Sequence, residues 1–242
     1  MARARKAQRA RTSTPRARTL VRASAPQLKA EEVAIVLLGA FNPSIFQPAW
    51  MASQGVLDES EASAAEIGII HPDVVSFRVG AIAIEVLRER FQAQTTDASA
   101  FESLRDLVVG VFGRLLHTPI GAMGINRSTH HELPSHAAWN RLGHRLVPKD
   151  PWEPVMNRPG TKNITIEGTR DDSRVGYVRA IFEPSTLIEQ GVFQTINDHY
   201  QFNEGDPQKN IPASDAMTTL AEVWSDSLSR ARAIADHILT LA

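Results

Sequence analysis

The alternation of apolar and polar residues in the first half of the chain predicts short strands interrupted by helices. The apolar run 33–38 contains β-branched residues and ends at a glycine and an Asn-Pro pair, so we predict a buried strand there. Apolar residues over 44–54 recur at spacings that suit a short amphipathic helix. Alternating patterns over 74–79 and 82–93 flank Gly80, which predicts a β-hairpin.

A longer helix and a further strand complete this half. Residues 98–116 carry apolar side chains at every third or fourth position, and Ser99 with Glu102 has the spacing of a capping box. Residues 120–126 alternate like a strand in which glycines replace larger residues. Residues 55–70 show no clear pattern, although their acidic, Ser/Ala-rich part allows one more turn of helix. The order β-α-β-β-α-β matches a ferredoxin-like unit.

The second half predicts a helix, three strands and a long final helix. Ser135 begins a helix that extends to about Leu146, and a proline-rich loop follows it. Residues 213–241 repeat apolar side chains along one stripe, so we predict a helix that packs one face on a sheet, with Ser214 as its cap. The three strands between these helices are predicted at 162–168, 174–183 and 190–202.

These elements place the chain in the α+β class, with an antiparallel or mixed sheet packed on helices. We divide it into a basic tail over 1–28, a β-α-β-β-α-β half over 29–147 and a β-β-β-α half over 148–242. The pattern leaves open whether the two halves form one continuous domain. A hydrophobic content of 43% in 242 residues is enough for a sizeable core.

Charge is unevenly distributed along the chain. The chain carries 26 basic and 27 acidic residues, yet residues 1–28 contain no Asp or Glu and few bulky apolar groups. Such a segment cannot bury enough surface to offset the entropy of ordering it, so we expect a disordered tail. Its basic residues are candidates for binding a polyanion: Arg3, Arg5, Lys6, Arg9, Arg11, Arg16, Arg18 and Arg22.

The basic tail has several interpretations. Nucleic acid, anionic lipid and an acidic protein are all candidate partners, although the tail lacks the interleaved aromatic residues that stack on bases. The alternatives are a solubilising tail, a transit-like peptide or a start codon assigned upstream. Another option is that the tail folds back onto the acidic remainder of the chain.

A histidine-rich stretch is the candidate metal site. Imidazole and carboxylate groups bind zinc-like ions, and this stretch offers His130, His131, Glu132 and His136. The spacing matches no recognised metal motif, because Pro134 separates the glutamate from the last histidine in a loop rather than on one helix. The sequence therefore leaves two interpretations: a metal-dependent enzyme, or polar histidines near a helix start.

Two further positions are candidates for function. Alternation along 190–202 places Asp198 between large apolar neighbours, where burial raises the pKa of a carboxyl group and suits it to acid–base chemistry. Its neighbour His199 faces the other side of the strand, which argues against a catalytic pair. Trp152 lies among prolines rather than on an apolar helical stripe, so we predict that it is an anchor for a protein partner.

Several classes of function are disfavoured by the sequence. The chain has no cysteine, which excludes disulfides, thiolate metal sites and cysteine catalysis. It contains no glycine-rich nucleotide loop, no nucleophile elbow and no kinase motif set. No apolar run is long enough to span a membrane and no secretory signal begins the chain, so we expect a cytoplasmic protein without a cofactor.

Four segments within residues 31–150 form a recognisable order: the opening strand, Ser76–Val79 with its partner strand, the Phe101–Leu116 helix, and Gly121–Asn126. This order resembles that of an uncharacterised, sporadically distributed bacterial α+β family. The shared motifs are structural, and the resemblance implies no catalytic residues. The histidine-rich loop and the long tail lie outside the pattern.

The chain thus has a complete set of folding signals and no converging catalytic set. We therefore predict a non-enzymatic binding or adaptor protein, chaperone-like in one version, that binds a protein or peptide. The tail would add attraction to a polyanion or an acidic partner. The alternative is a metal-dependent enzyme centred on the histidine-rich stretch. A homo-oligomer is compatible with both.

Overall fold

One antiparallel sheet runs through the part of the chain that this computed structural model describes, residues 25–242. Its strands lie in the order β2-β3-β4-β5-β1-β6-β9-β8-β7, and β10 pairs with β6 to complete a 10-stranded sheet. The strands are β1 (Gln27–Gly39), β2 (Glu66–His71), β3 (Val74–Val79), β4 (Ile82–Leu87), β5 (Arg90–Thr95), β6 (Pro119–Glu132), β7 (Ile164–Thr169), β8 (Gly176–Pro184), β9 (Gly191–Gln201) and β10 (Ile211–Pro212).

Strand β6 joins the two halves of the sequence. It pairs along most of its length with β1 on one side and with β9 on the other. Ile125, for example, lies opposite Ile35 of β1 and opposite Asp198 of β9. Residues 29–147 and 148–242 therefore contribute strands to a single continuous sheet.

The ferredoxin-like arrangement that the element order of the first half predicts is not confirmed. A ferredoxin-like unit has four strands, whereas the first half contributes the six strands β1 to β6 to a 10-stranded antiparallel sheet. Residues 66–71, which gave no clear pattern, form β2, and the charged residues Arg88 and Glu89 divide the predicted strand 82–93 into β4 and β5. The chain from β2 to β5 is consequently a meander.

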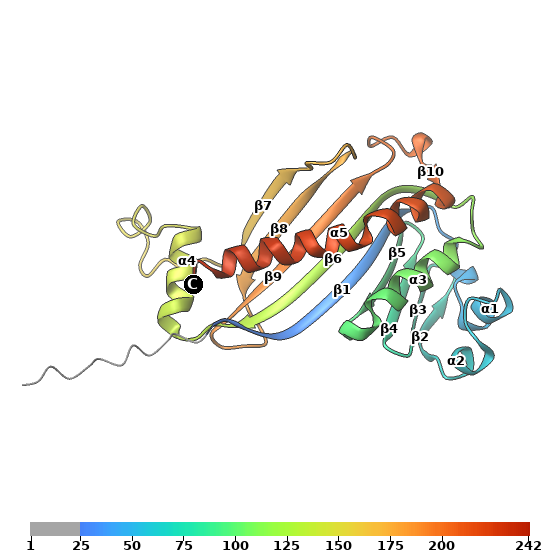
Figure 1. Cartoon of the computed structure of the whole chain (residues 1–242), viewed down its shortest axis with the longest axis horizontal. Helices are drawn as coiled ribbons and strands as arrows, with labels where there is room; N and C mark the ends of the chain where they lie inside the picture. Colours follow the sequence, from blue (N-terminus) through green and yellow to red (C-terminus); the bar gives the residue numbers. More distant parts are fainter. Residues whose placement is uncertain (1–24) are drawn as a thin grey trace, which may run out of the picture.

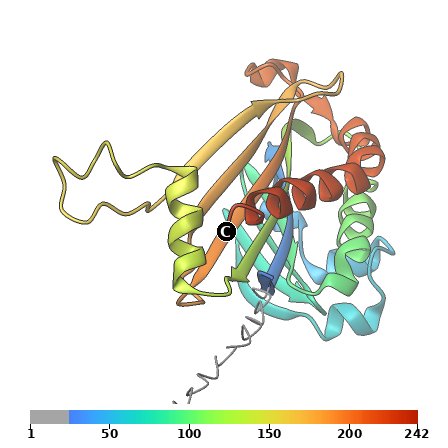
Figure 2. The ribbon, with the colours of Figure 1, turned by 60° about the vertical axis from the view of Figure 1, so that its left-hand side comes forward.

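Helices cover one face of the sheet, as Figure 1 shows. The long helix α5 (Ala213–Leu239) crosses the strands, and α3 (Phe101–Phe112) lies beside it over β5 and β1. The short helices α1 (Pro48–Ser53) and α2 (Glu59–Ser63) lie near β2 and β3, and α4 (His136–Leu146) lies at the opposite end of the sheet. Figure 2 shows α3 and α5 together on one side of the strands.

The period-two pattern of the strands explains which face the helices cover. Val33, Ile35 and Leu37 of β1 are fully buried on the covered face, while Val36 is partly accessible and Leu38 is exposed. The same alternation along β9 buries its even-numbered residues from 192 to 200. The opposite face of the sheet carries no helix within residues 25–242.

The main core lies between the sheet and helices α3 and α5. The ring centroid of Phe91 is 5.0 Å from that of Phe112 and 5.7 Å from that of Phe46. From α5, Leu220 and Trp224 enter the same core, and the Trp224 indole Nε1 donates a hydrogen bond to Glu102 Oε1 at 2.9 Å. This hydrogen bond satisfies the one polar atom of the indole inside an apolar environment.

Helix α3 occupies most of the predicted range 98–116, but it does not begin with the predicted Ser99–Glu102 capping box. A 3-10 turn over Ala98–Ala100 precedes the helix, and the Asp97 carboxylate accepts a hydrogen bond from the Ser99 amide at 2.9 Å. The Glu102 carboxylate instead accepts the hydrogen bond from the Trp224 indole.

The elements of the second half agree closely with their predictions. Helix α4 starts at the predicted place, and the Ser135 hydroxyl caps it by accepting from the Ala138 amide at 3.1 Å. The three predicted strands are β7, β8 and β9, each with its ends shifted by one or two residues. Helix α5 has its predicted extent, although Ser214 lies inside the helix after an N-cap at Pro212 and does not cap it.

No helix within residues 25–242 is long and apolar enough to span a membrane. The tail predictions, from Arg3 to Arg22, fall outside the described residues. The binding of a polyanion by the tail therefore stays a prediction.

Candidate functional site

The most buried group of ionisable residues in the described chain surrounds Asp198. The alternation of β9 places this aspartate on the face covered by α5, and it is 1% exposed, as the sequence pattern predicted. Its neighbour His199 points to the opposite face, where it stacks on Tyr177 with ring centroids 4.4 Å apart. The two residues do not form a catalytic pair.

The Asp198 carboxylate is fully engaged by groups from three elements. Arg170, in the turn after β7, donates to Oδ1, and Arg230 of α5 donates to Oδ2. Oδ2 also accepts from the hydroxyl of Tyr200 at 3.0 Å and from that of Ser227 at 2.6 Å. Two guanidinium groups and two hydroxyls thus replace the water that a buried carboxylate would lose.

Arg170 is as deeply buried as its partner. Its side chain is 2% exposed, and its guanidinium lies 4.0 Å from the centroid of the Tyr200 ring. It also donates to both oxygens of Asp172, at 2.9 Å and 2.5 Å. Hydrogen bonding by Arg170 lowers the pKa of Asp172 from its usual value to about 2. Burial by itself lowers the pKa of Arg170, but its bonds to Asp172 and Asp198 reverse the direction and raise it.

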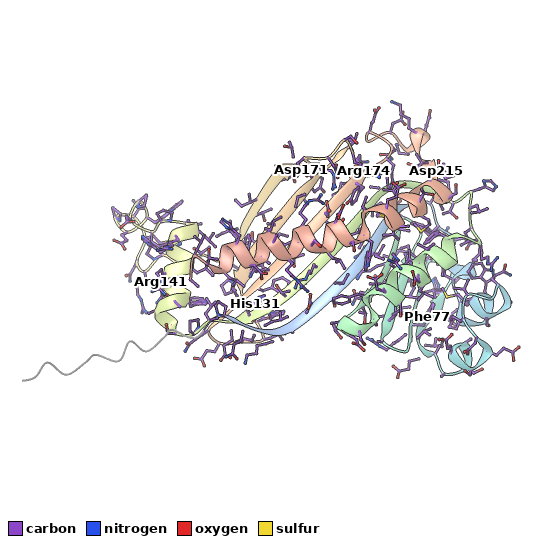
Figure 3. The ribbon with its side chains drawn as sticks, viewed as in Figure 1. Phe77, His131, Arg141, Asp171, Arg174 and Asp215 are labelled. Atoms are coloured by element: carbon purple, nitrogen blue, oxygen red, sulfur yellow. The ribbon has the colours of Figure 1, made fainter. Side chains whose placement is uncertain are left out.

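We call Arg170, Asp172, Asp198, Tyr200, Ser227 and Arg230 the Asp198 cluster. Figure 3 marks its outer end, with Asp171 and Arg174 at the turn between β7 and β8. Burial raises the pKa of Tyr200, so its hydroxyl stays protonated and donates. The hydrogen-bonding groups of the cluster bind one another, and its residues line neither of the two cavities described below. A substrate therefore has no access to Asp198 there, and we interpret the cluster as a structural contact that joins β7, β9 and α5 rather than as an acid–base site.

The structure does not bring the predicted metal ligands together. His130 and His131 are adjacent on β6 and face opposite sides of the sheet, and His130 Nδ1 lies 2.8 Å from the Ser185 hydroxyl. Glu132 is 2.8 Å from the Lys29 ammonium, and His136 stacks on Trp139. Within residues 25–242 no three His, Asp or Glu side chains are placed to hold a metal ion, so the geometry does not support the metal-enzyme interpretation.

Trp152 lies at an exposed position next to an apolar cavity. The loop between α4 and β7 presents Trp152, Val155 and Met156, which are 49%, 79% and 52% exposed. Beside this loop is a cavity of about 340 Å³, which we call the α4 cavity. Its apolar walls come from α4 and from the ends of β7, β8 and β9, and they include Trp139, Leu142, Leu146, Ile164, Phe182 and Val192.

Lys149 is the most unusual polar residue of the α4 cavity. Its ammonium donates to the Gly143 carbonyl at 3.1 Å and to the Val147 carbonyl, both at the C-terminal end of α4. Burial lowers its pKa. A cation at the end of a helix compensates the unpaired carbonyls there, so Lys149 is explained as a helix cap that shapes the cavity wall.

The sequence predicted Trp152 as an anchor for a protein partner, but it gave no indication of the α4 cavity beside it. The cavity depends on where α4 lies relative to the ends of three strands, and neither hydrophobic period nor loop composition contains that information. The sequence feature that could have indicated a binding site here is the group of apolar residues within the proline-rich loop.

Comparison with known proteins adds no functional assignment. No family model matches the chain, and no curated protein matches it. The function must therefore be inferred from the geometry of the chain itself.

The Asp198 cluster predicts a large effect of a small substitution. We expect Asp198→Asn to lower the free energy of unfolding by about 3–5 kcal/mol, because it leaves two guanidinium groups without their shared counter-ion. Urea denaturation at neutral pH measures the change. The control is Glu167→Gln, which removes an exposed ion pair with Arg179 at 2.7 Å and should cost less than about 1 kcal/mol. Equal costs for the two variants would refute a structural role for the cluster.

Proposed function

We propose that this protein is a non-enzymatic binding protein, of an adaptor or chaperone-like kind, that captures an apolar segment of a partner protein at the α4 cavity. The observation that carries the proposal is the position of three exposed apolar side chains, Trp152, Val155 and Met156, on the loop that borders this cavity. Exposed apolar groups beside a concave apolar surface are typical of binding sites.

The size and chemistry of the α4 cavity support a peptide side chain as its occupant. A volume of about 340 Å³ lies in the lower range for ligand pockets and accommodates one or two large apolar side chains. The charged residues of the lining are of both signs: Lys149 and Arg158 are basic, and Glu153 and Glu183 are acidic. Selection at this site would therefore depend on apolar contacts more than on net charge.

The tail supplies the second part of the proposal. Its basic residues, Arg3 to Arg22, would attract a polyanion or an acidic region of the partner, with binding that weakens as salt concentration rises. A cytoplasmic location and self-association belong to the same proposal. The proposal also includes membership of the bacterial α+β family that the first half resembles. That resemblance implies no catalytic residues.

A peptide-binding assay on the full chain tests the α4 cavity. We expect an array of random ten-residue peptides to show binding enriched for Trp, Phe, Leu and Met. Gly160→Leu should abolish this enrichment, because Gly160 lines the cavity and no heavy atom lies within 4 Å of the position of its new Cβ. A leucine at this lining position would add apolar bulk at the cavity without meeting existing atoms at its Cβ.

Gly168→Leu is the matched control for Gly160→Leu. Gly168 lies on the edge strand β7, it too has no atom within 4 Å of an added Cβ, and it is not part of the cavity lining. This variant should retain the enrichment. If wild-type protein shows no preference for apolar peptides, or if both variants lose it equally, the proposed function is wrong.

Tail binding has a separate test. Replacement of the eight basic residues between Arg3 and Arg22 by Gln should abolish binding of polyuridine RNA at low salt. For the wild-type chain, the logarithm of the affinity should fall linearly with the logarithm of salt concentration, as expected for counter-ion release. Fluorescence anisotropy measures both, and salt-independent binding would contradict the polyanion interpretation.

A further inference from the structure

A second cavity lies under the C-terminal turns of α5, where they pass over β6 and the start of β1. It has a volume of about 460 Å³, and we call it the His131 cavity. Arg127 and His131 line it from β6, while Arg232 and Asp236 line it from α5. Figure 3 marks His131 in this region, at the opposite end of α5 from Asp215.

His131 is buried and incompletely satisfied. It is 6% exposed, and its Nδ1 has no hydrogen-bond partner among the described residues. Two buried neighbours share this condition: the Thr129 hydroxyl and the side-chain amide of Gln194, which lie opposite each other on β6 and β9. Buried polar groups without partners are rare because each loses its hydrogen bonds to water without replacement. Of the three residues His131 lines the cavity, which places an incompletely satisfied imidazole at its wall.

The charges around the His131 cavity favour an anionic occupant. The side chain of Arg127 is only 7% exposed, and its Nε donates to Glu31 Oε1 at 2.6 Å. Its two terminal amino groups make no hydrogen bond to the rest of residues 25–242. Arg232 and Asp236 are one helical turn apart, yet no ion pair joins them. Two arginine side chains therefore have donors available at one cavity.

We propose that the His131 cavity binds a small oxyanion, a carboxylate or a phosphate group, through Arg127, His131 and Arg232. Planar guanidinium groups match both anions by paired hydrogen bonds. Glu31 and Asp236 balance the two arginines when His131 is neutral, so protonation of His131 supplies the net positive charge that an anion requires. The site is separate from the α4 cavity, and its test does not depend on peptide binding.

The occupation of this site should depend on pH. Burial lowers the pKa of His131, and the positive charge of Arg127 lowers it further, while Asp236 and Glu31 act in the opposite direction. The charged or titratable groups around the imidazole are therefore Arg127, Arg232, Glu31, Asp236 and His130. An anion that binds only beside the protonated imidazole must raise this pKa, so its affinity increases as pH falls below the ordinary histidine value of about 6.5.

Nuclear magnetic resonance of the histidine side chains in the full-length protein tests the proposal. Inorganic phosphate and acetate are titrated separately at pH 6 and pH 8, with ionic strength held constant by sodium chloride. We expect a saturable shift of the His131 imidazole resonances that is stronger at pH 6. A response to phosphate alone identifies a phosphate site, and a response to acetate alone identifies a carboxylate site.

Two variants separate specific binding from general charge effects. Arg232→Gln changes an exposed residue of the cavity and should weaken binding about tenfold, the effect of one charge-assisted hydrogen bond. Arg141→Gln changes an exposed arginine of α4 outside the cavity and should leave binding unchanged. The proposal is overturned if neither anion gives a saturable shift of His131, or if the two variants respond alike.

Discussion

The pairing of β6 with β1 on one side and β9 on the other is the interaction on which the rest of this structure depends. These backbone hydrogen bonds connect a meander from the first half of the chain to a three-stranded unit from the second half. A sheet of this width has a large apolar face that must be covered. Helix α5, about 40 Å long at 1.5 Å per residue, crosses that face from the β10 end to the α4 end.

Covering the sheet with one long helix brings polar residues of β6 and β9 out of water. At Asp198 this burial is compensated by two arginines and two hydroxyls, which join β7, β9 and α5. Near the end of α5, His131, Thr129 and Gln194 retain unpartnered atoms, and His131 lines a cavity. The same physical constraint therefore produces a closed ionic cluster at one point and a candidate ligand site at another.

The sequence allowed good prediction of elements whose signals are local. Alternation located β3 and β9, the spacing of apolar residues located α3 and α5, and Pro134-Ser135 marked the start of α4. Strand β2 was missed because the adjacent Ile69 and Ile70 break the period of two, and its six residues are all exposed, with a register shift between Ile67 and Ile69. The ferredoxin-like arrangement is not confirmed, because element order alone does not determine how many strands form or which strands pair.

The candidate sites show the same limit. The burial of Asp198 followed from the strand pattern, but its arginine partners lie 28 and 32 residues away along the chain and could not be assigned. The grouping of His130 and His131 failed because neighbouring residues of a strand point to opposite faces, a rule that applies only once β6 is known to extend to Glu132. The two cavities arise from packing between distant segments.

The central claim is that both halves of the chain form one cooperative unit held together by β6. Hydrogen exchange of the full-length protein under native conditions measures it most directly. Buried amides of β1, β6 and β9 should exchange only through global opening and should share one free energy, equal to that of unfolding. If the amides of β8 and β9 exchange at a much lower free energy while β1 and β5 stay protected, the two halves unfold separately and the claim is wrong.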